Sequence, residues 1–201
     1  MNADRFRQKC KRGKTMKASD LAFSGVQHIS VYSLGVSQLY ISEEKIENVL
    51  TWFRKTDLSN FTPLPVHDFG NGRLTLTDGH TRAYIAYRSG ISEIPVIYDH
   101  DDIITCDEGM KLYQNDIVWC DRFNLKSVCD LAGRIVSSAD YKRLWEDRCD
   151  VGYNLIINSS EWEKSLWSQS HPDLFLFGVS EDKKRLFYEN NSGDIFVFDA
   201  D

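Results

Sequence analysis

The sequence predicts an α+β fold in which a small mixed-sheet core is followed by a helical annex and a C-terminal antiparallel β-meander. Three hydrophobic patterns support this prediction. Strand-like and helix-like segments alternate over residues 37–98, which is typical of a small α+β unit. Residues 107–153 show helical periodicity. Residues 174–198 contain three short apolar segments separated by polar turns, as in a β-meander.

The core is predicted to begin with a strand and a helix. Residues 37–41 (SQLYI) suit a short strand, and Ser42 can cap the helix that follows over residues 43–55. Apolar residues recur in this helix at spacings of three and four, which predicts an inward-facing stripe. The stripe consists of Ile46, Val49 and Phe53.

A β-hairpin is predicted next. Residues 62–69 (TPLPVHDF) indicate an edge strand, because proline lacks the N–H group that a central strand donates to its neighbour. Residues 70–72 (Gly-Asn-Gly) predict a tight turn into a second strand over residues 73–77, since Asn-Gly is a strong hairpin signal.

A second helix and a last strand complete the predicted core. Asp78 is the expected N-cap of a helix that ends near Gly90, a residue suited to the left-handed position after a helix. Residues 93–99 (EIPVIYD) then suit a strand. One face of the helix is expected to pack closely on the sheet, and it carries Ala83, Ala86, Tyr87 and Gly90.

The chain is therefore expected to have four parts. They are a flexible basic N-terminal arm (1–25), the core (26–102), a helical annex (103–160) and the C-terminal β-meander (161–201). Three short helices are predicted in the annex from three apolar stripes. These stripes are Met110, Tyr113, Ile117 and Cys120; Val128, Leu131 and Ile135; and Tyr141, Leu144 and Trp145.

Charge is distributed unevenly along the chain. The net charge is −6, yet residues 1–17 carry seven basic side chains against Asp4 alone, which leaves 17 basic and 29 acidic residues in the remainder. A basic arm over residues 5–17 could contact nucleic-acid phosphates, although a solvated tail is the commoner outcome. The acidic remainder is unlike a duplex-binding domain, which would normally be basic.

The expected localisation is cytoplasmic, with no membrane partner. No segment approaches the roughly 18 apolar residues that a membrane-spanning helix needs, and the N-terminus has no signal-peptide pattern. The five cysteines are odd in number and contain no Cys-x-x-Cys, which predicts reduced thiols.

The candidate functional site is Asp-Gly-His-Thr-Arg at residues 78–82, where the predicted strand passes into the helix. Amides in a first helical turn lack intrahelical acceptors, and with the helix dipole they favour an anion. Gly79 lets a phosphate approach the backbone, Thr81 and Arg82 add donors, and His80 can donate or accept. Asp78 would hold a magnesium ion or orient Arg82. The simpler alternative is that Asp78 only caps the helix and Gly79 only permits the turn.

These residues resemble the ParB/sulfiredoxin-like superfamily. The segment "TDGHTRAYIAYRSGISEIPVIY", with "SQLYISEEKIENVL" and "FTPLPVHDF" before it, is similar to the strand, helix, hydrophobic strand, "DGHRR-x-A" turn and "(I/V)PV" ending of that family. The resemblance covers about residues 36–100 and implies the ParB/sulfiredoxin-like core.

The branches of the superfamily differ at this turn. Chromosome-partitioning ParB proteins bind CTP with Gly-Glu-Arg-Arg, whereas this chain has Gly79-His80-Thr81-Arg82. Sulfiredoxins carry Gly-Cys-His-Arg, and because His80 replaces the cysteine, their chemistry is not expected here. ParB-like free-serine kinases carry Asp-Gly-His-His-Arg, from which this chain departs only at Thr81. Their upstream glutamate could correspond to Glu43 or Glu44.

The resemblance implies a nucleotide- or phosphate-binding site at residues 78–82. If the protein is an enzyme, a nucleotide-dependent phosphotransferase is the expected class, with magnesium at Asp78, a nucleoside triphosphate or diphosphate, and a phosphorylated small molecule as partners. The candidate catalytic residues are Glu43, Glu44, Asp78 and His80. A further acidic cluster, Asp99-His100-Asp101-Asp102, suits a divalent ion but is more typical of a solvated loop.

Two other functions remain open from the sequence. The basic residues 5–17 would suit a nucleic-acid-associated ParB-like protein of phage or mobile-element type. The aromatic segments of 174–198 would suit a non-enzymatic interaction scaffold, including a homo-oligomer.

Overall fold

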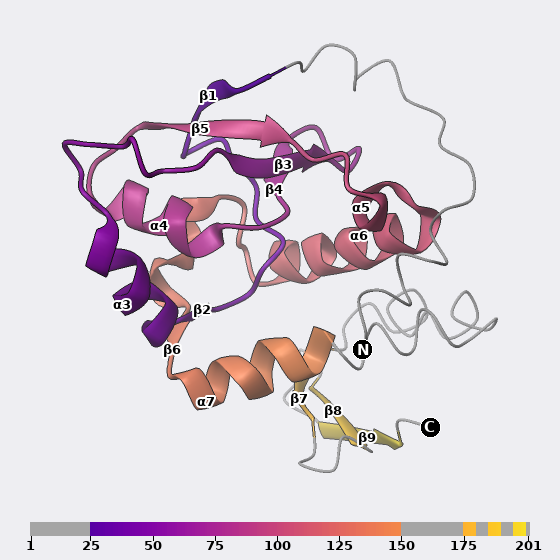
Figure 1. The fold of residues 1–201 in the computed structure, drawn as a ribbon. Coiled ribbons are helices and arrows are strands. Elements are labelled where there is room, and N and C mark those ends of the chain that lie inside the picture. Colours follow the sequence, from indigo (N-terminus) through magenta and orange to yellow (C-terminus); the bar gives the residue numbers. More distant parts are fainter. Residues whose placement is uncertain (1–24, 150–174, 180–184, 190–194, 200–201) are drawn as a thin grey trace. The chain divides into compact units, whose positions relative to one another are not determined.

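The computed structural model describes residues 25–149, 175–179, 185–189 and 195–199 of the chain (Figure 1). These residues form an α+β fold with a four-stranded mixed sheet and several helices, which confirms the predicted class. The chain divides into two compact units, one over Asn2–Ser138 and the other over Ala139–Asp201 with Met1. Within the described residues, no helix is long and apolar enough to cross a bilayer.

The four-stranded sheet has the order β1-β5-β3-β4. β1 (Gln27–Ser30) pairs antiparallel with β5 (Glu93–Tyr98), β5 pairs parallel with β3 (Leu64–Asp68), and β3 pairs antiparallel with β4 (Leu74–Leu76). The chain passes from β4 to β5 through α4 (His80–Arg88), and Figure 1 shows α4 beside the sheet. Buried aliphatic side chains of the sheet form much of the core, and they include Leu64, Val66, Leu76, Ile94 and Val96.

The prediction that residues 62–69 form an edge strand is wrong, because β3 lies between β5 and β4. Proline is tolerated there because the β3–β4 ladder begins only at Val66. Beside it, the Pro65 carbonyl accepts a hydrogen bond from the amide of Thr77, one residue beyond β4. The missing N–H of Pro65 therefore falls at the end of the ladder, where it costs no central hydrogen bond.

The remaining core strands are partly as predicted. The hairpin is confirmed: β3 and β4 pair antiparallel, and Gly70 and Gly72 have φ of 81° and 78°. The predicted strand over residues 37–41 is wrong in extent, since only β2 (Ile41–Ser42) forms, in parallel pairing with β6 (Ile135–Val136). β1 was not predicted, because its four residues show little hydrophobic alternation. It forms by pairing with β5, a strand far along the chain.

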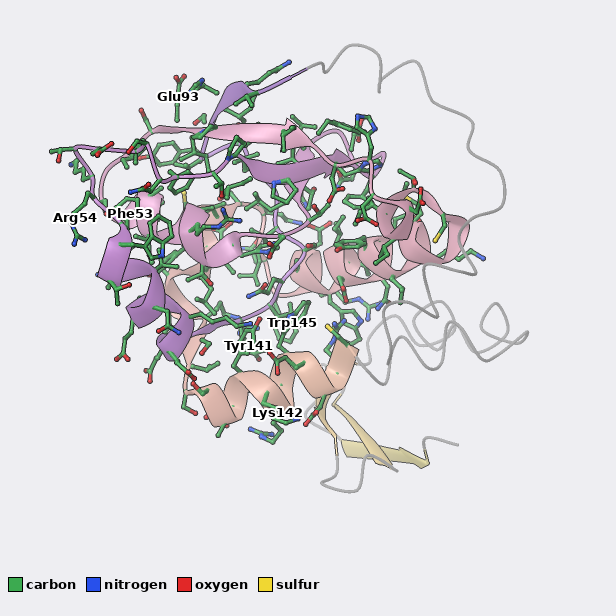
Figure 2. The ribbon with its side chains drawn as sticks, in the orientation of Figure 1. Phe53, Arg54, Glu93, Tyr141, Lys142 and Trp145 are labelled. Atoms are coloured by element: carbon green, nitrogen blue, oxygen red, sulfur yellow. The ribbon has the colours of Figure 1, made fainter. Side chains whose placement is uncertain are left out.

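The first helix, α3 (Glu43–Trp52), begins at the predicted residue and ends earlier than predicted. Ser42 occupies the N-cap position but its side chain makes no capping hydrogen bond. Of the predicted stripe, Phe53 is buried just after the helix, while Ile46 and Val49 are half-buried. Figure 2 shows Phe53 and Arg54 leaving the end of α3 in different directions, and Arg54 is exposed.

The annex differs from the predicted three short helices. After α5 (Asp102–Thr105) comes one long helix, α6 (Asp107–Arg122), and then a 3-10 helix, η1 (Val128–Gly133). Ile135 of the second predicted stripe lies in β6, so that stripe is not one helix face. The first stripe is confirmed, because Ile117 packs with Phe69 and Ile104 in a cluster that Met110 and Tyr113 also contact, and Cys120 is buried.

The chain then enters α7 (Ser138–Tyr141), which continues as a π-helical turn, η2 (Lys142–Glu146). β7 (Phe175–Val179), β8 (Arg185–Glu189) and β9 (Ile195–Asp199) pair antiparallel in that order. Their connections lie outside the described residues, as does the predicted basic arm, so the complete meander and the arm stay predictions.

The prediction of reduced thiols is wrong for Cys106, which is disulfide-bonded. Cys120, Cys129 and Cys149 carry free thiols. An odd number of cysteines leaves room for a pair, and sequence spacing alone does not reveal which residues the fold brings together.

Candidate functional site

The turn before α4 places a left-handed glycine directly at the helix start. Gly79 is the N-cap residue, with φ 78° and ψ 19°, and no side chain caps the helix. The prediction that Asp78 is the N-cap is therefore wrong by one residue. The left-handed Gly79 separates Asp78 from the helix, and the Asp78 side chain is 81% exposed.

The first turn of α4 has amides for which the described part of the chain supplies no acceptor. The first helical hydrogen bond runs from Ala83 N to Gly79 O, at 3.0 Å. No hydrogen bond joins the amides of His80, Thr81 or Arg82 to an acceptor among the described residues, and the first turn contains no acidic residue. These N–H groups and the helix dipole together make the turn electropositive.

Arg82 adds a full positive charge beside these amides. Its Nη1 donates to Thr62 Oγ1 at 2.5 Å, and its Nη2 would lie 3.0 Å from a Cβ atom placed on Gly79. The same Nη2 is 3.8 Å from Asp78 Oδ2, and since Asp78 is largely exposed this contact contributes little. The guanidinium is thus folded against the turn, and its partner in hydrogen bonding is a neutral threonine.

Thr81, next to Arg82 in the turn, is half-buried. Its hydroxyl group forms no hydrogen bond with another described residue. Arg82 lies against Gly79, and it also bonds Thr62, a residue that sequence reasoning missed; phosphate binding by these residues stays a prediction.

His80 points into the protein interior. It is 4% exposed, and its Nε2 accepts a hydrogen bond from the amide of Ser37 at 3.1 Å. The Ser37 hydroxyl in turn donates to Leu76 O at 2.8 Å. Burial lowers the pKa of His80 to about 4, while the negative charge of Asp78 opposes this shift. The imidazole is therefore neutral at pH 7, and its hydrogen bond holds the Ser37 loop in place. His80 can contribute to the anion site only through its backbone amide.

The two candidate glutamates are at the start of another helix. Glu43 and Glu44 are exposed in the first turn of α3, and Glu44 Oε2 accepts a hydrogen bond from Ser138 Oγ at 2.8 Å. Among the described residues, no hydrogen bond or ion pair connects either glutamate with residues 78–82. The structure does not choose between them.

A preformed metal centre is not found in the described part of the chain, where no three His, Cys, Asp or Glu side chains could hold an ion together. Magnesium at Asp78 would therefore need oxygen ligands from a bound phosphate. Two carboxylates of the cluster at residues 99–102 already accept hydrogen bonds from the protein. Asp99 accepts from Thr77 Oγ1, and Asp101 caps α5 by accepting from Ile103 N.

The fold and this turn define a small α+β protein whose sheet positions an electropositive helix start with an adjacent arginine. Comparison with known proteins adds no class to that description. No protein-family model matches the chain, and no curated protein matches it.

Proposed function

We propose that the protein binds the phosphate groups of a nucleotide, or another phosphorylated small molecule, at the Asp78–Arg82 turn. The observation that carries the proposal is that the Arg82 guanidinium lies against Gly79, next to first-turn amides that have no acceptor among the described residues. Phosphate oxygens suit both kinds of donor, and a helix N-terminus adds a favourable dipole. The resemblance of this segment to the ParB/sulfiredoxin-like superfamily supports the same assignment.

Each residue of the turn has a distinct role in this proposal. The backbone amides of His80, Thr81 and Arg82 donate to phosphate oxygens, and the guanidinium exchanges its contact with Thr62 for one with the anion. Because Gly79 lacks a side chain, Leu64 and the Arg82 guanidinium can lie close against the turn. Asp78, exposed at the edge of the turn, would hold a magnesium ion that also contacts the phosphate. The His80 ring acts only as an internal brace.

Phosphotransfer is the reaction class that this site could support. Such transfer depends mainly on positioning and charge neutralisation, for which amides, an arginine and a magnesium ion are suitable. The Asp-Gly-His-x-Arg pattern resembles that of the free-serine kinases, in which an upstream glutamate acts across the cleft. Glu43, or Glu44 once released from Ser138, is the candidate for that role here.

Nucleotide binding can be measured by calorimetry with ATP, ADP and CTP in the presence of magnesium. We expect Arg82→Ala to weaken binding by roughly 10- to 100-fold, because a charged hydrogen bond contributes about 1.5–3 kcal/mol. Arg88→Ala is the matched control, since Arg88 lies in the last turn of the same helix and donates to Tyr84. Absence of heat from every nucleotide at millimolar concentration would refute nucleotide binding at the turn.

A second function, nucleic-acid binding, is favoured by the charge of the N-terminal residues. Residues 1–17 contain seven basic side chains and a single acidic one, Asp4. We expect any DNA affinity in gel shifts to fall steeply with salt and to be lost when residues 1–17 are deleted. Retention of the full affinity by the deletion variant would contradict this function and leave the nucleotide site unaffected.

A further inference from the structure

Thr77, the residue immediately before the candidate turn, is held by three different elements. Its amide donates to Pro65 O of β3 at 3.1 Å, and its hydroxyl donates to Asp99 Oδ2, just after β5, at 2.5 Å. Its carbonyl accepts from the Tyr113 hydroxyl of α6 at 3.3 Å. The backbone therefore enters the turn from a fixed point.

Asp99 is itself fixed from several directions. Its amide donates to Val66 O at 2.7 Å, and its carbonyl lies 2.9 Å from Nδ1 of the buried His67. Since a carbonyl can only accept, the His67 ring is the donor. The second carboxylate oxygen accepts from the amide of Asp101 at 2.9 Å. The Asp99 backbone is thus fixed to β3, and its carboxylate is held at both oxygens, by Thr77 and by the residue that caps α5.

Asp78 and Gly79, the two residues that join Thr77 to α4, have little of this support. Asp78 is exposed, Gly79 has no side chain, and no side chain caps α4. The direction in which the first-turn amides point is consequently set by the fixed residue before the turn and by the helix after it. Beyond these two residues, the next side-chain anchors are the His80–Ser37 and Arg82–Thr62 hydrogen bonds in the first turn of α4.

We propose that Thr77 and Asp99 form a positioning pair that orders the Asp78–Arg82 turn for anion binding. The expected effect on anion affinity rests on the proposed function, but the ordering of the turn can be measured without a ligand. The pair would act through the backbone and would not touch the phosphate. Residues outside the binding motif would then determine how tightly the motif binds.

The first test is hydrogen exchange of the free protein. We expect Thr77→Val, which keeps the shape but removes the donor, to speed exchange of the Ala83 amide by about fivefold, the effect of losing one hydrogen bond. The Ala83 amide reports on the turn because it donates to Gly79 O, and the Ser89 amide at the far end of α4 serves as the internal reference. Thr77→Ser keeps a hydroxyl and should leave both rates near those of the unmodified protein.

The second test is nucleotide affinity, measured under conditions where circular dichroism shows each variant to be fully folded. Thr77→Val and Asp99→Ala should each weaken binding by about fivefold, and the double variant should lose little more, because both changes remove the same hydrogen bond. Thr51→Val is the control for general loss of a threonine hydroxyl, since Thr51 donates to Asn48 O within α3.

The possible outcomes separate this inference from the proposed function. Unchanged Ala83 exchange in Thr77→Val, or equal effects of Thr77→Ser and Thr77→Val, would overturn the positioning pair. Faster exchange together with no nucleotide binding by the unmodified protein would leave the ordered turn in place and refute the proposed function. Faster exchange with unchanged affinity would overturn the link between ordering and binding.

Discussion

Lowering the pH from 7 to 4 is expected to remove about 3 kcal/mol of folding stability through His80 alone. The pKa of His80 is about 4 in the folded protein, against 6.5 for an unperturbed histidine. Between these values the unfolded chain binds a proton that the folded protein does not. The contribution is therefore fully present above pH 6.5 and is lost as the pH falls toward 4.

The physical cause is the burial of a neutral imidazole that accepts a hydrogen bond. Nε2 of His80 accepts from the Ser37 amide, so protonation would place a donor against a donor in a site that is 4% exposed. Asp78 is the nearby charge that partly opposes the shift, but its side chain is largely exposed and its field is screened.

Urea unfolding of the unmodified protein and of His80→Gln, at pH 7 and pH 5, can isolate this contribution. Glutamine can still accept from Ser37 but does not titrate, so the variant should lose about 2 kcal/mol less than the unmodified protein over this interval. His28→Gln is the control for loss of a histidine, because His28 is exposed. An equally steep loss of stability in His80→Gln would show that His80 is not the group responsible.

His80 also illustrates which parts of the site can be predicted from sequence. Gly79, Thr81 and Arg82 are within one turn of each other, so their proximity follows from local geometry alone. The partner of the His80 ring is Ser37, 43 residues earlier, and the partner of Arg82 is Thr62, 20 residues earlier. Neither pairing leaves a signal in the spacing of residues, because it depends on how the strands are arranged in the sheet.

The same distinction applies to the fold. The hairpin and the left-handed Gly90 after α4 were predictable because each depends on a few adjacent residues. The central position of β3 and the pairing of β2 with β6 were not, because they depend on strands far apart in the chain. Proline in β3 does not mark an edge strand, because its effect depends on where the neighbouring strand ends.

Replacement of Gly79 by alanine is expected to cost about 2–4 kcal/mol of folding stability, more than the same replacement at Gly90. Both glycines are left-handed, with φ of 78° and 74°, so each substitution should lose about 1–2 kcal/mol from backbone strain alone. The surroundings differ. A Cβ atom at Gly79 would lie 2.8 Å from Leu64 Cδ2, whereas the nearest atom at Gly90 is Lys55 Nζ, at 3.4 Å.

The collision at Gly79 cannot be relieved cheaply. Leu64 is completely buried in the central strand, and moving it would disturb packing that extends across the sheet. Arg82 is the other neighbour, with Nη2 3.0 Å from the new Cβ, and this flexible end can move away from the turn. The substitution should therefore overpack the core and displace the guanidinium. Both effects result from the methyl group that replaces a hydrogen atom at residue 79.

Urea unfolding of Gly79→Ala and Gly90→Ala measures the first effect, with Gly90→Ala as the matched control for backbone strain. We expect the free energy of unfolding to differ between the two variants by about 1–3 kcal/mol, the usual cost of overpacking. Nucleotide calorimetry at a temperature where both are folded measures the second effect, and only Gly79→Ala should bind more weakly. Equal stability of the two variants would mean that Leu64 yields readily, and the close packing assigned to the turn would then be wrong.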